Sequence, residues 1–179
     1  MIEWTRWAAP AAAAIALIQP VQATQYYTVA TAQRAAFPNA TAFVEAHVVF
    51  TASDMAAIQR MAGTAPQARA QQVWRAFAGN QFLGFFVVDY VIGKHLVIDY
   101  AISLDPGGSV RRVDIMEYRE AYGGEIRGGS WLAQFVGKTA GSALQLNQDV
   151  RNIAGATLSS RHVTEGVKKV LALHAIRLK

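Results

Sequence analysis

Residues 72–118 decide the fold, and they read QVWRAFAGNQFLGFFVVDYVIGKHLVIDYAISLDPGGSVRRVDIMEY. The pattern repeats with a period of two and is rich in β-branched and aromatic residues, which is typical of β-strands. It predicts strands over residues 73–78, 82–91, 96–104 and 110–118, the last two separated by the turn Asp105-Pro106-Gly107-Gly108. Because consecutive strands with tight turns pair side by side, we expect an antiparallel sheet.

Helical patterns lie on both sides of this stretch. Residues 28–37 are alanine-rich, begin at Thr28 and end before Pro38, which predicts a short helix capped by Thr28. A strand is expected over residues 42–50, then a helix capped by Ser53-Asp54 and running to about Met61, and a short helix within residues 129–137.

The last predicted element is an amphipathic helix at the C-terminus. Its apolar stripe recurs at helical spacing and consists of Val163, Val167, Val170, Leu171 and His174. The predicted fold class is therefore α+β, an antiparallel sheet with helices packed mainly on one face.

The amino-acid composition excludes several kinds of protein and several kinds of site. The 179 residues are 53% hydrophobic and 16% charged, so the chain is able to bury a core and is not disordered. The absence of cysteine excludes disulfides, iron–sulfur clusters, thiolate zinc sites and a cysteine nucleophile. No metal site is expected, and neither is nucleic-acid binding, because no basic run is interleaved with aromatic residues.

The net charge of +5 is unevenly distributed. Residues 24–105 hold five basic and five acidic residues, whereas residues 106–179 hold eleven basic and six acidic ones. A basic half indicates an anionic ligand, an acidic partner or a membrane surface, and the alternative is simple solubility.

The N-terminal residues 1–23 have the pattern of a secretory signal. A short segment with Arg6 precedes an apolar run over residues 7–18, and Val21-Gln22-Ala23 supplies small residues for a signal peptidase. The run is too short for a membrane-spanning helix, which needs about 20 residues. We expect export and cleavage, with an uncleaved membrane anchor as the alternative.

The stretch IAGATLSS at residues 153–160 is the most informative about function. Small residues and then hydroxyls lead into the last helix, and basic residues lie near it in sequence (Arg151, Arg161, Lys168 and Lys169). A helix N-terminus with little side-chain bulk is suited to bind a phosphate. The alternative is that Ser159 or Ser160 only caps the helix.

AGATLSS followed by VTEGVKKVLA resembles the flavin-binding domain shared by the flavin subunits of bacterial sodium-pumping quinone reductases and related electron-transport complexes. The family signature reads Asp-x-x-Ser-Gly-Ala-Thr-x-Thr/Ser. The resemblance covers roughly residues 80–173 and includes Gly93-Lys94-His95, residues 116–120, Tyr122-Gly123-Gly124-Glu125-Ile126 and residues 131–138. Two positions depart from the signature: its serine is Ala154 here, and its aspartate falls at Arg151.

The resemblance implies that FMN is attached through its phosphate to Thr157, by a separate magnesium-dependent transferase that uses FAD. Gly155 and Ala156 would leave room for the phosphate, Leu158 belongs to the same signature, and Ser159 and Ser160 would donate to phosphate oxygens. No residue is expected to be catalytic.

Four further residues are candidates for cofactor contacts. Glu117 and Tyr118 end a strand beside a glycine turn, where ligand contacts are common, and a solvated edge is the alternative. Trp131 is suited to stack on the flavin ring or to pack its helix on the sheet. Lys138 is suited to face the phosphate or to be an ordinary surface charge.

The resemblance implies an exported electron-transfer protein rather than a free-standing enzyme. It would carry electrons from a membrane reductase to a periplasmic or membrane acceptor. The alternatives are a flavin reductase acting directly on a soluble acceptor and a flavin-free adaptor module of the same fold. We expect a signal at 1–23, an N-terminal helix/strand subdomain at 24–79 and the FMN-binding domain at 80–179.

Overall fold

The computed structural model describes residues 23–179, so all but the last residue of the expected signal over residues 1–23 lies outside the described residues. Six strands form one antiparallel sheet in the order β1-β6-β5-β4-β3-β2. Their bounds are β1 Thr24–Gln25, β2 Ala42–Val49, β3 Ala70–Ala78, β4 Gln81–Ile92, β5 Val97–Leu104 and β6 Val110–Tyr118. The α+β class and the antiparallel sheet expected from the sequence are confirmed.

Four α-helices accompany the sheet, α1 Val29–Ala36, α2 Ala52–Ala62, α3 Gly129–Leu132 and α4 Thr157–Leu173. Short 3₁₀ segments, η1 Gly124–Arg127 and η2 Ala133–Phe135, flank α3, and the π-helical η3 His174–Leu178 continues α4. None of the helices within residues 23–179 is both long and apolar enough to span a bilayer.

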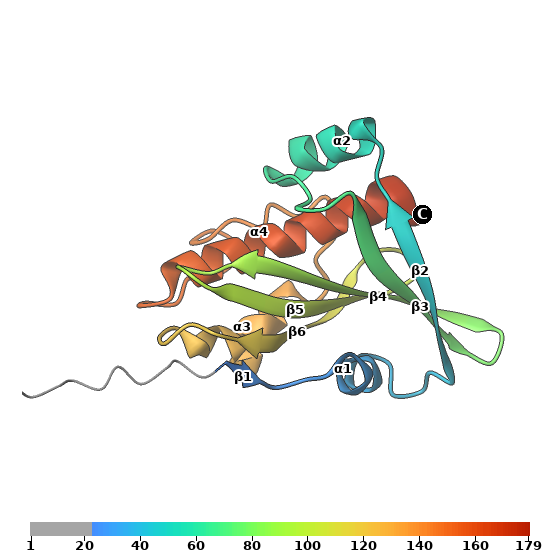
Figure 1. Ribbon diagram of the computed structural model, residues 1–179, viewed down its shortest axis with the longest axis horizontal. Helices are drawn as coiled ribbons and strands as arrows, with labels where there is room; N and C mark the ends of the chain where they lie inside the picture. The colour runs from blue at the N-terminus through green and yellow to red at the C-terminus, as the bar shows by residue number, and fades with distance from the viewer. Residues whose placement is uncertain (1–22) are drawn as a thin grey trace, which may run out of the picture.

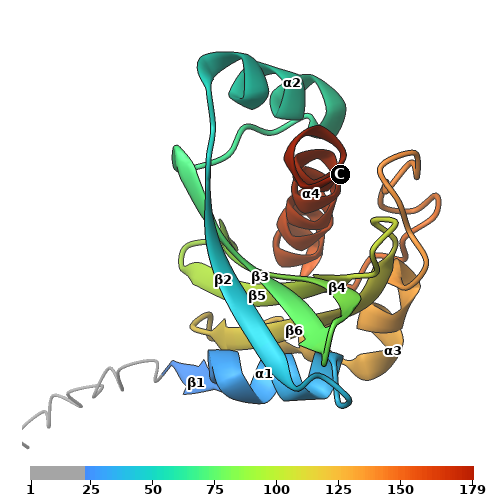
Figure 2. The ribbon, with the colours of Figure 1, turned by 90° about the vertical axis from the view of Figure 1, so that its right-hand side faces the viewer.

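The helices cover the two faces of the sheet unequally (Figures 1 and 2). The long helix α4 lies along one face with α2 beside it, and α1 lies on the opposite face. The larger core is between α4, α2, α3 and the sheet and includes Tyr100, Ile102 and Val167. A smaller core under α1 includes Phe37, Trp74 and Phe86. These two layers follow from the alternation of side chains along each strand.

A buried ion pair fixes the C-terminal half of α4 to the sheet. Lys169 Nζ lies 2.9 Å from Asp89 Oδ2 of β4, and both side chains are 4% exposed. The Tyr100 hydroxyl donates to the same carboxylate, and Lys169 donates to Gln67 Oε1. Burial, with the Asp89 carboxylate, raises the pKa of Tyr100 well above its ordinary value. Because every charge in this group has a partner, burial is tolerated.

The sequence placed the boundaries of most elements to within a few residues. One correction concerns α2, whose N-cap is Thr51 and not Ser53-Asp54, with Asp54 at the third helical position. A second concerns α4, which begins at Thr157, so that Leu158 to Ser160 belong to its first turn and not to a preceding loop. The domain boundary expected at residue 80 falls at the β3–β4 turn, and strands from both sides of it share one sheet.

Candidate functional site

The N-terminus of α4 lacks the side-chain cap that α1 and α2 have. Thr28 caps α1 and Thr51 caps α2, each in a reciprocal capping box. The N-cap of α4 is Ala156, which has no side chain able to accept a hydrogen bond, and no acidic residue lies in the first turn. Within residues 23–179, no recorded hydrogen bond takes the amide N–H groups of Thr157, Leu158 or Ser159. These groups and the helix dipole make this end a site for an anion.

The backbone before α4 leaves open space in front of these amides. Gly155 has a φ of +83°, a backbone conformation that residues other than glycine rarely adopt. A Cβ added at Gly155 would have no other atom within 4 Å. The Ala156 N–H donates to the Ile153 carbonyl over 3.1 Å, and the Ser160 N–H donates to the Ala156 carbonyl over 2.8 Å. The chain therefore enters the helix through a tight turn whose outer side is unobstructed.

The loop after β6 packs against this turn at Gly123. A Cβ at Gly123 would lie 2.8 Å from the Tyr118 hydroxyl oxygen and 2.9 Å from Ala156 Cβ, so only glycine fits between them. The Tyr118 hydroxyl donates to the Tyr122 carbonyl. Burial raises the pKa of Tyr118, and the Ser159 hydroxyl beside it lowers that pKa by less. Tyr118 thus connects the end of β6 to the loop that follows it.

Only one of the three hydroxyls near the start of α4 is accessible. Thr157 is exposed, and its Oγ1 accepts a hydrogen bond from Asn152 Nδ2 over 3.1 Å. Ser159 and Ser160 are 4% and 0% exposed. Ser160 Oγ and Asn152 Oδ1 are buried and have no hydrogen-bond partner in the structure. The geometry singles out Thr157 as the hydroxyl that a phosphorus atom is able to reach.

A cavity of about 360 Å³ opens beside Thr157. It lies between the end of α2, the loop around residues 144–147 and the outer side of α4. Arg161, one turn after Thr157, and Lys168 both line it, with Glu165 as the acidic residue among the lining side chains. The size is within the range of small-ligand pockets, and its charge favours an anionic guest.

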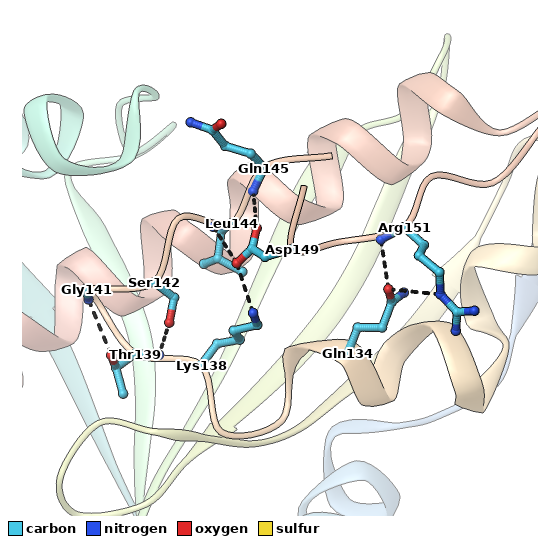
Figure 3. Close-up of polar contacts among 9 residues, drawn as sticks. All are labelled: Gln134, Lys138, Thr139, Gly141, Ser142, Leu144, Gln145, Asp149 and Arg151. Carbon is cyan, nitrogen blue, oxygen red and sulfur yellow. Dashed lines mark hydrogen bonds and ion pairs between the residues drawn. The ribbon is translucent and has the colours of Figure 1, made fainter. Parts of the chain in front are cut away.

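Lys138 lies in the long connection before α4 and is held by Asp149 (Figure 3). The distance from Lys138 Nζ to Asp149 Oδ2 is 2.9 Å, and the same carboxylate accepts the N–H groups of Leu144 and Gln145 at 3.1 and 2.7 Å. The Gln145 N–H, together with Lys138, lowers the pKa of Asp149 to about 2. The structure thus gives Lys138 a role in fixing this connection.

The other two candidates also have partners within the protein. The Trp131 ring is 5% exposed and packs edge-on against Phe135, and its Nε1 donates to the Arg151 carbonyl over 2.7 Å. Glu117 Oε2 pairs with Arg119 at 2.6 Å. Of the ten candidate contact residues, Thr157, its loop neighbours and Tyr118 come together, whereas Glu117, Trp131 and Lys138 have other partners.

Three comparisons with known proteins bear on this site. The family model described as the FMN-binding domain matches residues 93–172, which include Tyr118, Gly123 and the whole start of α4. Residues 93–172 are therefore similar to an FMN-binding domain.

The fold has a solved counterpart. The crystal structure of Shewanella oneidensis NqrC matches with a TM-score of 0.51 at 13% sequence identity, over 82% of this chain and 88% of that chain. At this identity the match shows a shared fold. No curated protein matches the sequence significantly. The family-model match supports FMN as the ligand of this region, and the solved structure supports the fold alone.

The structure places three further residues at the site, of which the sequence indicated only Arg161, as one of the basic residues near the start of the last helix. Asn152 contacts the Thr157 hydroxyl, Gly123 contacts Ala156, and Arg161 lines the cavity beside Thr157. Arg161 had a usable signal, because a residue four positions after Thr157 lies on the same side of a helix. Asn152 had none, since its position relative to the hydroxyl depends on the turn at Gly155.

Proposed function

We propose that FMN is carried on Thr157 as a phosphoester and that the chain serves as an exported electron carrier. The observation that supports this most is the pairing of one exposed hydroxyl with an uncapped helix end, while Ser159 and Ser160 are buried. The residues present fit the cofactor, because unpaired amides, Arg161 and a cavity of about 360 Å³ adjoin that hydroxyl.

The attachment step breaks the phosphoanhydride bond of FAD and forms a phosphoester bond to Thr157. Thr157 Oγ1 forms a bond to the phosphorus next to the riboflavin part of FAD, the bond from that phosphorus to the AMP oxygen breaks, and AMP leaves. The hydroxyl proton goes to a base of the transferase. Asn152 Nδ2 donates to Thr157 Oγ1, which holds the threonine in one orientation and occupies one of its two lone pairs, so the other lone pair is left to form the bond to phosphorus.

The protein then holds the ester with groups already in place. The amides of Thr157 to Ser159 would stabilise the negatively charged phosphodiester, and Arg161 would add a cation one turn away. When bound, FMN supplies one- and two-electron transfer. Arg151, at the signature's acidic position, is exposed and held by Gln134 Oε1, which accepts from its N–H over 2.8 Å.

The proposed partners and location follow from the family resemblance and the N-terminal pattern. A flavin transferase loads the chain, a membrane reductase donates electrons, and the carrier passes them on in the periplasm or at the membrane. N-terminal sequencing of material from the periplasm should give Thr24 as the first residue, because Val21-Gln22-Ala23 precedes it. A retained Met1 in the membrane fraction would instead make the chain membrane-anchored.

The attachment is tested by co-expression with a flavin transferase in an exporting host. Wild-type chain should gain the mass of one FMN less one water and fluoresce after denaturing electrophoresis. Thr157→Val should lose the adduct completely and stay folded, because the change keeps the volume and removes only the hydroxyl. Ser159→Ala is the matched control and should keep the adduct, since Ser159 is 4% exposed.

One further variant and two contrary outcomes complete the test. Arg151→Asp restores the acidic position of the signature and should raise the labelled fraction if the transferase recognises that carboxylate. An adduct that persists in Thr157→Val and maps to another residue would refute the assignment. Wild-type chain that binds FMN reversibly and never labels would remove the ester and leave the phosphate site at α4.

A further inference from the structure

The outer edge of β6 has no partner strand along its middle. At one end β1 pairs with it for two residues, and the N–H groups of Tyr26 and Tyr27 donate to the Met116 carbonyl. At the other end, Val110 exchanges hydrogen bonds with Gly137 and Lys138 at 2.8 and 2.9 Å. Between these ends, residues 111–115 pair only with β5 in the part of the chain that the structure describes. Arg111 is exposed and Arg112 is half-buried, whereas Val113, Asp114 and Ile115 are 2–4% exposed, so the main-chain donors and acceptors of this edge are open to an incoming chain at its Arg111 end.

A cavity of about 900 Å³ lies against this edge, and we call it the edge slot. Five consecutive β6 residues, from Arg111 to Ile115, line it. Successive side chains of a strand point to opposite faces, so a cavity bordered by all five lies at the strand's edge and not on one face. At about 3.3 Å per residue the slot is about 13 Å long, which suits an extended segment better than a small anion.

Helical segments form the two walls of the edge slot. Ala35, Ala36 and Pro38 line it from the end of α1, and Gly129, Leu132, Ala133 and Val136 line it from α3 and η2. Both α1 and α3 contact β6, and they lie at the β6 side of the sheet (Figure 2). A strand edge beside a helix is the geometry that domains use to bind a peptide as an added strand.

The lining of the edge slot has a net positive charge. Arg111 lies 5.0 Å from the Phe37 ring centre and Arg127 lies 4.8 Å from the Tyr26 ring centre, so aromatic rings hold both guanidinium groups in place. Arg112 pairs with Asp114 at 2.6 Å, which neutralises the acidic side chain of the lining. Two cations therefore remain to attract carboxylates.

We propose that the edge slot binds an acidic segment of a partner protein in an extended conformation, as a short strand added to β6. Main-chain hydrogen bonds at the accessible Arg111–Arg112 end of this edge would supply affinity, and carboxylates directed to Arg111 and Arg127 would supply selectivity. The edge slot and the cavity beside Thr157 share no lining residue, so this docking does not depend on the flavin. The alternative is that Arg111 and Arg127 serve only to prevent other strands from pairing with β6. That role would require neither the cavity nor the aromatic rings that hold the two guanidinium groups.

The test uses the full chain and a short blocked peptide of alternating glutamate and valine. Binding is followed by fluorescence anisotropy and by the amide NMR shifts of residues 111–115. We expect saturable binding that weakens as salt rises, with the shifts confined to β6 and the facing ends of α1 and α3. The same peptide methylated on alternate main-chain nitrogens should not bind, because it cannot pair with a strand.

Variants of the chain separate charge from shape. Arg111→Glu and Arg127→Glu should each weaken the peptide at least tenfold, and Arg34→Glu, an exposed charge of α1 outside the slot, is the matched control. Ala133→Trp should block the slot without changing its charge. Equal binding of the methylated peptide, equal binding to Arg34→Glu and Arg111→Glu, or no binding at millimolar peptide overturns the proposal. Self-association of the chain through residues 111–115 would overturn it as well.

Discussion

The two ends of α4 differ in how their polar groups are satisfied. The C-terminal half of α4 and the η3 segment that continues it bury polar side chains that fix the helix. The N-terminus of α4 leaves main-chain donors without protein acceptors. Lys169 is 4% exposed and paired with Asp89, and His174 is 4% exposed between Phe85 and the β5–β6 turn. Ala156 provides no cap, and Thr157 is exposed. The buried C-terminal half fixes the position of the helix, and the amides at the N-terminus are thereby held in place for a ligand.

The comparison predicts two separate sets of effects. Changes at the C-terminal half should lower stability and leave the flavin chemistry of the folded protein intact. Changes at the N-terminal end should alter flavin attachment and barely affect stability. Four experiments test whether the two sets of effects are separate, and the first is the one in which we expect the greatest change.

Lys169→Met should produce the largest loss. It leaves the Asp89 carboxylate buried without its cation, and such a change destabilises by about 3–5 kcal/mol. Chemical denaturation measures the free energy of unfolding, and Lys168→Met, at the neighbouring and more exposed lysine, should change it by less than about 1 kcal/mol. Adding Asp89→Asn to Lys169→Met should recover part of the loss. If Lys169→Met were as stable as wild type, the ion pair would not be what fixes α4.

Gly108→Ala should have the next largest effect. Gly108 has a φ of +87°, and a Cβ there would lie 2.3 Å from ring atoms of His174. Backbone strain and this contact together should lower stability by about 1–3 kcal/mol. Gly63→Ala is the control, because Gly63 has a φ of +80° and open space around its Cβ.

The two alanine changes separate strain from contact. Gly63→Ala should show the strain alone, and combining Gly108→Ala with His174→Ala should bring the two positions to similar losses, as measured by a double-mutant cycle. Equal losses for Gly63→Ala and Gly108→Ala in the single variants would mean that His174 does not press against the β5–β6 turn.

Lowering the pH should weaken the C-terminal end of α4. Burial, followed by the charge of Lys179, lowers the pKa of His174 below its ordinary value of 6.5, although Asp105 and the Pro106 carbonyl oppose this shift. The unfolded chain therefore binds a proton more readily than the folded chain, so the free energy of unfolding should fall as the pH drops through 6.5. The Nε2 atom of His174 is buried without a hydrogen-bond partner, which explains why the charged form of the ring is disfavoured.

Denaturation curves between pH 5 and pH 8 measure this slope, and flavin labelling at each pH should follow the folded fraction only. His174→Leu should flatten the slope, and His47→Gln, at an exposed position of β2, serves as the control. A slope that survives in His174→Leu would assign the pH dependence to another group.

The same division explains what the sequence was able to predict. The strands of the sheet and the stripe from Val163 to His174 follow from periodicity, which is local and strong. The role of Thr157 came from the short signature around it. The sequence could not show that Ser159 and Ser160 turn inward, because their burial depends on the exact residue at which α4 begins.

Partners distant in sequence were also beyond prediction. Lys138 and Trp131 looked like candidates for ligand contacts because of their residue types. The structure places Lys138 against Asp149 and Trp131 against the Arg151 carbonyl, within the connection that leads to α4. Likewise the edge slot depends on β1 pairing with only two residues of β6, which no pattern in either segment indicates.

Leu158→Glu should have the smallest effect on stability and a clear effect on attachment. Leu158 is 41% exposed in the first turn of α4, so a carboxylate there fits without repacking and interacts favourably with the helix dipole. The free energy of unfolding of the flavin-free chain should rise by about 0.3–1 kcal/mol at low salt. The same carboxylate repels a phosphate, so the initial rate of FMN labelling, measured by fluorescence after denaturing electrophoresis, should fall several-fold. Leu158→Gln is the neutral control and should label at close to the rate of Leu158→Ala, which separates charge from the loss of an apolar contact. If L158E labels as fast as L158Q, the amides of this helix end do not bind the phosphate, and the contrast between the two ends of α4 would be one of stability alone.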